Sequence, residues 1–202
     1  MSSSVADAVA ALRAGELAVV PTDTVYGLAA TAYRAEPARR LYALKRRPPE
    51  QPTALVASDL DVLFECVPEL RGRAGVVARA LLPGPYTLVL PNPACRFAWL
   101  TGSTPHAIGV RVPAAAGAAA EVLAGAGAVV ATSANLPGGP EPRALRDVPP
   151  ELAAGAAALV DGGELPGTAS TVLDLTGLEP SVVREGAGDV DEALARIRQA
   201  LR

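Results

Sequence analysis

Helical and strand-like hydrophobic spacing alternate along most of this chain. Residues 5–12 carry apolar side chains at helical spacing, and Gly15 follows as a stop signal. Short apolar runs predict buried strands at residues 17–21, 53–57, 86–91, 107–113 and 128–133. Helical patterns cover residues 36–47, residues 59–82 with a break near Pro68, and residues 114–127. Residues 25–31 are compatible with a second strand or with the turn into one.

The last third of the chain contains a cluster of predicted strands. These strands are residues 157–163, 170–176 and 181–185, and a closing helix follows over 189–201 with Asp189 as its N-cap. Residues 133–150 are rich in Pro and Gly and predict a long surface loop. Alternating helices and strands followed by clustered strands predict an α/β fold with a mixed sheet. We see no repeat and no domain boundary, so residues 1–202 are expected to form one domain.

Composition and charge exclude several classes of protein. The net charge of −3 argues against a generally basic nucleic-acid-binding surface, although it leaves room for a local basic cleft. No apolar run of about 18 residues and no leader pattern occur, so we expect a cytoplasmic protein without membrane spans. Cys66 and Cys95 lie too far apart to indicate a disulfide framework. With His106 as the only histidine, neither a His-rich metal site nor a His-based triad is expected.

Polar side chains occur where several predicted strands end, which is where α/β sheets bind ligands. Residues 22–24 (Thr-Asp-Thr) follow the first strand, and on residue preference alone they favour a turn. Arg111 lies inside an apolar strand, on the face opposite Val110 and Val112. It therefore faces either solvent or an anion in a cleft.

Lys45 is the single lysine among 18 Lys and Arg residues. The segment LKRRPP around it is compatible with a solvated helix end, where the helix dipole favours cations. It is equally compatible with an anion clamp, because lysine is a compact point charge that binds phosphates. Ser133 and Asn135 end another strand and suit a phosphate or ribose. No Walker A, GxGxxG or GxSxG pattern is present.

Seven short motifs, taken in order, resemble the threonylcarbamoyl-AMP synthase family of the YrdC/Sua5 type. They are PTDTVYGL, KRRPPEQP, LPGPYTLVLP, IGVRVP, TSAN, STVLD and VVREG, and the resemblance extends from about residue 5 to 190. It implies the short single-domain form, with a twisted mixed sheet flanked by helices around a cationic cleft. It also implies a nucleotidyltransferase that makes L-threonylcarbamoyladenylate and pyrophosphate from L-threonine, bicarbonate or CO2, and ATP. The product would pass to the machinery that installs t6A on tRNA.

The matching positions imply two groups of binding residues. The threonine group consists of Thr22, Arg111 and Ser170. The nucleotide group consists of Lys45, Arg47, Ser133, Asn135 and Arg184, and the predicted catalytic residues are Lys45 and Arg47. Mg2+ would accompany ATP, and no protein nucleophile is required because charge stabilisation and positioning carry most phosphoryl-type transfers.

Two alternatives remain open at this stage. One is a relative of the same fold that handles a carbamoyl adenylate with another acceptor. The other is a non-catalytic module that binds double-stranded RNA or tRNA, which the net negative charge disfavours. Direct contact with tRNA, the oligomeric state and the identity of the metal are not determined by the sequence.

Overall fold

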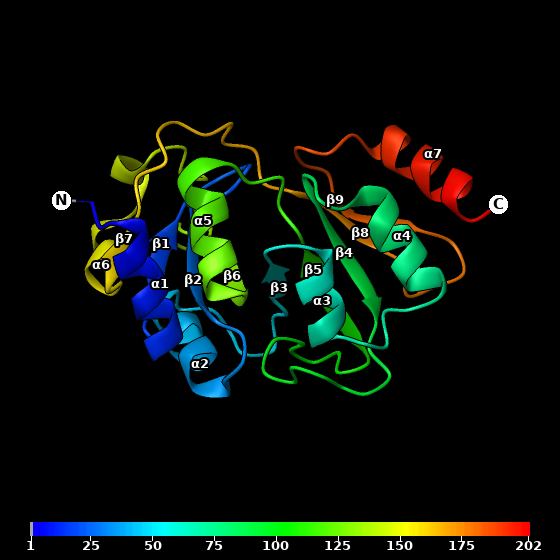
Figure 1. Cartoon of the computed structure of the whole chain (residues 1–202), viewed down its shortest axis with the longest axis horizontal. Helices are drawn as coiled ribbons and strands as arrows, with labels where there is room; N and C mark the ends of the chain where they lie inside the picture. Colours follow the sequence, from blue (N-terminus) through cyan, green and yellow to red (C-terminus); the bar gives the residue numbers. More distant parts are fainter. Residues whose placement is uncertain (1) are drawn as a thin grey trace.

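The computed structural model describes residues 2–202, which contain one nine-stranded mixed sheet (Figure 1). The strand order is β7-β1-β2-β6-β3-β5-β4-β8-β9. The strands are β1 Ala18–Val20, β2 Gly27–Thr31, β3 Ala54–Ala57, β4 Tyr86–Pro91, β5 Ala107–Arg111, β6 Ala128–Ser133, β7 Ala158–Leu159, β8 Thr171–Asp174 and β9 Ser181–Arg184. Parallel pairs (β1 with β7, β3 with β5, β4 with β8) mix with antiparallel ones. The predicted α/β fold with a mixed sheet is confirmed.

Helices cover the sheet in two groups. They are α1 Val5–Ala14, α2 Ala35–Leu44, α3 Leu60–Cys66, α4 Arg73–Leu81, α5 Gly117–Ala126, α6 Pro150–Ala154 and α7 Val190–Ala200, with a short 3-10 turn, η1, at Leu145–Asp147. Helices α1 and α5 pack side by side over the β1–β2–β6 end, whereas α4 and α7 pack together at the other end (Figure 1). Two predicted helix signals are confirmed, since Gly15 is the left-handed C-cap of α1 and Asp189 caps α7.

The central strands separate a closed face from an open one because successive side chains point to opposite faces. In β4, Tyr86, Leu88 and Leu90 are buried in the main core, while Thr87 and Val89 point to the other face. The main core also takes apolar side chains from α2, α3, α4 and α7. Helices α1 and α5 cover only one end of the opposite face. The rest of that face is left for a ligand.

Several predicted boundaries were wrong. The pattern over 36–47 ends as a helix at Leu44 with Lys45 as its C-cap, because Arg46 adopts a left-handed φ of 53° and Pro48 follows. The predicted strand 157–163 shrinks to the two residues of β7. Residues 25–31, which the pattern left open between a strand and the turn into one, form a strand from Gly27 onward. The predicted loop 133–150 contains η1, and α6 starts at its end with Pro150 at the first helical position.

The two faces of β4 predict different responses to truncation. Leu88→Ala should lower the free energy of unfolding by about 2–5 kcal/mol, because Leu88 is fully buried in the main core and a cavity would remain. Val89→Ala, on the open face, should cost about 1 kcal/mol. Urea unfolding of both variants checks this difference, and equal losses would contradict the assignment of the faces.

Candidate functional site

A cavity of about 770 Å³ lies on the open face of the sheet. Its floor is built from small residues on neighbouring strands, namely Gly27, Ala54, Ala107, Gly109 and Ala131. Small side chains let a ligand lie close to the sheet backbone. A cavity of this volume is within the usual range for small-molecule sites.

The cavity brings together all of the residues that the motifs singled out. The lining includes Thr22, Lys45, Arg47, Arg111, Ser133, Asn135, Ser170 and Arg184. Four of these are cations, and no Asp or Glu is among the lining residues of the described chain. The arrangement therefore suits an anionic ligand. The individual ligand contacts stay predictions.

Lys45 reaches the cavity from the C-cap of α2 and is only 4% exposed. Its Nζ donates hydrogen bonds to the Ser133 carbonyl oxygen (2.5 Å) and to Asn135 Oδ1 (3.0 Å). The pKa of Lys45 is lowered to about 8, mainly by burial and also by the nearby charge of Arg47, while the charge of Glu141 opposes both effects. The ammonium therefore lies among neutral acceptors, and an incoming anion would supply its missing countercharge.

The loop after β6 holds the acceptors of Lys45 in place. Asn135 Oδ1 also accepts from Ser133 Oγ (2.7 Å), and Asn135 Nδ2 donates to the Gly139 carbonyl oxygen (2.8 Å). The Asn135 amide orientation is thus set on both sides. Within the predicted loop 133–150, residues 134–139 have no regular secondary structure, and several of them form one wall of the cavity.

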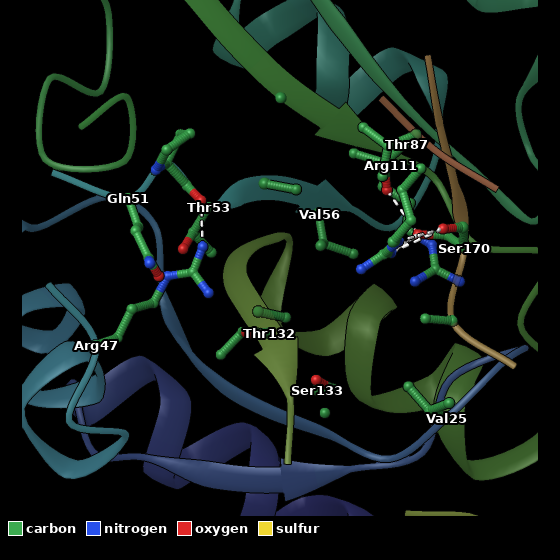
Figure 2. Close-up of a pocket in the computed structure, with 18 of the residues that line it drawn as sticks. Val25, Arg47, Gln51, Thr53, Val56, Thr87, Arg111, Thr132, Ser133 and Ser170 are labelled. Atoms are coloured by element: carbon green, nitrogen blue, oxygen red, sulfur yellow. Dashed lines mark hydrogen bonds between the residues drawn. The ribbon is translucent and has the colours of Figure 1, made fainter. Parts of the chain in front are cut away.

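Arg47 lines the same wall, where Figure 2 shows it beside Gln51 and Thr53. Its Nη2 donates to the Pro52 carbonyl oxygen (2.6 Å), and its guanidinium lies 5.9 Å from the centre of the Tyr42 ring. These contacts hold the guanidinium at the cavity edge.

Arg111 lies across the cavity from Arg47, close to Thr87 and Ser170 (Figure 2). The alternative left open by the strand pattern is resolved, because Arg111 faces the cleft and is only 9% exposed. Its Nη2 donates to Asp23 Oδ1 (2.5 Å) and to Thr24 Oγ1 (2.8 Å). Burial lowers the pKa of Arg111, and Asp23 opposes that shift.

Ser170 and Arg184 form one hydrogen-bonded unit at this end. Arg184 Nη2 donates to the Ser170 carbonyl oxygen (2.7 Å), and the Ser170 hydroxyl lies 2.9 Å from that of Thr87. A register shift between β8 and β9 occurs opposite Arg184. Arg184, predicted with the nucleotide group, thus contacts a residue of the predicted threonine group.

Thr22 forms the turn that residue preferences favoured. Its Oγ1 donates to the Val25 carbonyl oxygen (2.7 Å) and accepts from the backbone N–H groups of Thr24 (3.1 Å) and Val25 (3.2 Å). The turn closes the cavity beside β2. Its hydroxyl is occupied within the turn, so contact between Thr22 and threonine stays a prediction.

Three residues of the site were missed from the sequence. Asp23 and Thr24 were assigned only to a turn, yet both bind Arg111. Thr87 lies in the motif LPGPYTLVLP and was given no role, yet it contacts Ser170 in the cavity. Strand alternation could have identified Thr87, because it faces away from Tyr86 and Leu88. No local signal links Asp23 to Arg111.

Neither a metal cluster nor a membrane span is found in residues 2–202. No group of three or more His, Cys, Asp or Glu side chains there is arranged to hold a metal ion. No helix in that range has the length and apolar character needed to cross a membrane.

Comparison with known proteins identifies the family. The Sua5/YciO/YrdC family model, described as "Telomere recombination", matches residues 10–186. The chain belongs to this family. Its sequence is 32% identical over 182 residues to a threonylcarbamoyl-AMP synthase of Pyrococcus abyssi, covering 90% of this chain and 53% of that protein. The predicted resemblance is confirmed.

A second relative and a solved structure extend the comparison. A putative threonylcarbamoyl-AMP synthase of Mycobacterium tuberculosis is 32% identical over 186 residues, covering 92% of this chain and 85% of that protein. The crystal structure of Pyrococcus abyssi Sua5 complexed with L-threonine superposes with a TM-score of 0.87 at 31% identity, covering 96% of this chain and 57% of that one. The chain thus spans about half the length of the Pyrococcus synthase, at 53%, and most of the mycobacterial protein.

The burial of Lys45 predicts an unusual titration. Because Lys45 is the only lysine, a protein labelled with 13C at lysine Cε should show one side-chain signal, titrating with a pKa of about 8. Arg47→Gln should raise this pKa, and Glu141→Gln should lower it, because the two charges act in opposite directions. A pKa near the ordinary lysine value of about 10.4 would contradict the described environment.

Proposed function

We propose that this protein is an L-threonylcarbamoyladenylate synthase, a nucleotidyltransferase that consumes L-threonine, bicarbonate or CO2, and ATP. The observation that carries the proposal is that one cavity is lined by every predicted site residue, with four cations and no carboxylate among the described lining residues. The family relatives named threonylcarbamoyl-AMP synthase support the same reaction. The Sua5 structure with L-threonine supports an amino-acid site in this cavity.

The chemistry requires two anions to meet. ATP carries about four negative charges, and the carboxylated amino group of threonine adds another. An oxygen of this N-carboxylate would attack the α-phosphorus of ATP, forming one P–O bond as the bond to the leaving pyrophosphate breaks. Fixed positive charges aimed at the phosphates would offset the repulsion and stabilise the transition state. No covalent intermediate with the protein is needed.

The cavity offers a separate cationic group for each anion. Lys45 and Arg47 at one side would hold the phosphates of ATP, with Ser133 and Asn135 beside them. Arg111 and Ser170 at the other side would hold threonine (Figure 2). Arg184, which is hydrogen-bonded to Ser170, would contact the α-phosphate of ATP, where the two substrates react.

Mg2+ would enter with ATP as part of the substrate. Magnesium in such sites is held mainly by phosphate oxygens and water. The cavity lining agrees with this, because its oxygen donors in the described chain are hydroxyls, amides and carbonyls and not carboxylates. The product would pass to the machinery that modifies tRNA, and the protein would work in the cytoplasm beside that machinery.

The synthase assay tests the proposal directly. Purified protein with ATP, threonine and bicarbonate should release pyrophosphate in a threonine-dependent manner, with threonylcarbamoyl-AMP detected by mass spectrometry. Lys45→Ala should lower kcat/KM about 100-fold or more, because a buried charge at the phosphates is lost.

Arg46→Ala is the matched control for Lys45→Ala. Arg46 points outward to Glu151 (2.8 Å), so activity should stay within about twofold. Pyrophosphate release without threonine dependence would contradict the proposal.

Carbamoyl phosphate separates the synthase from a relative with another acceptor. Replacing threonine and bicarbonate with carbamoyl phosphate should release no pyrophosphate from ATP, because the threonine N-carboxylate is the proposed nucleophile. Equal release with carbamoyl phosphate would favour the alternative enzyme. A salt-dependent tRNA complex without any pyrophosphate release would instead favour the RNA-binding alternative.

A further inference from the structure

Asp23 is a nearly buried carboxylate that lies behind the cavity wall. Its side chain is 10% exposed, it does not line the cavity, and so it has no direct contact to offer a substrate. Its two oxygens have different partners. Oδ1 accepts from Arg111 Nη2 (2.5 Å), and Oδ2 accepts from the backbone N–H of Ala114 (3.0 Å).

The bond to Asp23 leaves part of the Arg111 guanidinium free. Nη2 is shared between Asp23 and Thr24, whereas neither Nη1 nor Nε has a hydrogen-bond partner within residues 2–202. Nε is fully covered, so Nη1 is the donor left for a ligand in the cavity. One edge of the guanidinium is therefore anchored while another stays available.

The second oxygen of Asp23 holds the segment that follows Arg111. Ala114 comes three residues after Arg111, at the exit of β5. The Asp23 carboxylate therefore holds both the Arg111 side chain at the end of β5 and the backbone of Ala114 just after it. Arg111 itself is 11% exposed by side chain, and an unpaired cation at that depth would be costly. Asp23 supplies the countercharge before any substrate arrives.

We propose that Asp23 is a positioning residue for the amino-acid end of the reaction. It orients Arg111 so that its free edge faces the carboxylate of threonine. Orienting a binding group before the substrate enters lowers the entropy lost on binding. This inference rests on the proposed function, because it takes threonine as the ligand at Arg111.

Asparagine cannot replace Asp23 in this arrangement. Both partners of the carboxylate are donors, whereas an amide offers one accepting oxygen and one donating NH2 group. Asp23→Asn would therefore lose the countercharge and set two donors against each other. Asp23→Glu keeps the charge and both acceptors but moves them by one methylene.

The test compares the two substrates in steady-state kinetics. Asp23→Asn should raise the KM for threonine about tenfold or more while the KM for ATP changes less than about threefold, because Lys45 and Arg47 are untouched. Asp23→Glu should raise the KM for threonine less than Asp23→Asn does. If Asp23→Asn does not fold, the kinetics of Asp23→Glu are compared with those of wild type instead. Asp59→Ala is the control for a merely structural aspartate. Asp59 caps α3 by accepting from Val62 N–H (2.8 Å), so its loss should lower Tm and leave both KM values unchanged.

A second readout does not depend on activity. In 15N-arginine-labelled protein, the Nε–H signal of Arg111, assigned by its loss in Arg111→Lys, should shift or broaden in Asp23→Asn. Wild-type protein that makes no pyrophosphate would refute the proposed function, while this signal would still report whether Asp23 orders Arg111. The inference is overturned if the signal is unchanged, or if Asp23→Asn lowers Tm with both KM values as in wild type.

Discussion

The two-sided central sheet is the constraint on which the site depends. Strand alternation sends Leu88 and Val110 into the main core, and this same alternation sends Thr87 and Gly109 to the open face. The core packing that stabilises the fold therefore also fixes which side chains form the cavity floor. A slip of one residue in β4 or β5 would exchange the two sets, so stability and site geometry are set together.

The cations of the cavity illustrate a second constraint. A positive charge kept ready for an anion must be held by the protein without being neutralised completely. Lys45 is held by neutral oxygens, and the resulting cost appears as a pKa of about 8. Arg111 is held by a carboxylate on one edge. Lysine can lose its proton when buried whereas arginine essentially cannot, so the two positions are not interchangeable.

The end of α2 explains how three consecutive cations reach different places. Lys45 keeps helical geometry as the C-cap, whereas Arg46 adopts a left-handed φ of 53°. This reversal points Arg46 outward to Glu151 and returns Arg47 to the cavity. The segment is thus a helix terminus that also lines the cavity. The helix does end at this motif, but Lys45 is buried and not solvated. The anion clamp stays a prediction, and the helix end is what lets Lys45 and Arg47 face the same cavity.

The sequence by itself determined the α/β class, most strands, the helix caps at Gly15 and Asp189, and the set of residues gathered in the cavity. The class, the strands and the caps follow from local periodicity, and local signals need no knowledge of partners. The set of cavity residues follows from the resemblance of the seven motifs to a known family. Only the tertiary structure decided that Asp23 pairs with Arg111, which is 88 residues away. The turn preference of Asp23 predicts its backbone conformation correctly, but it does not predict the hydrogen-bond partner of its carboxylate. That depends on strand order, which places β5 near the turn before β2 through the intervening β6 and β3.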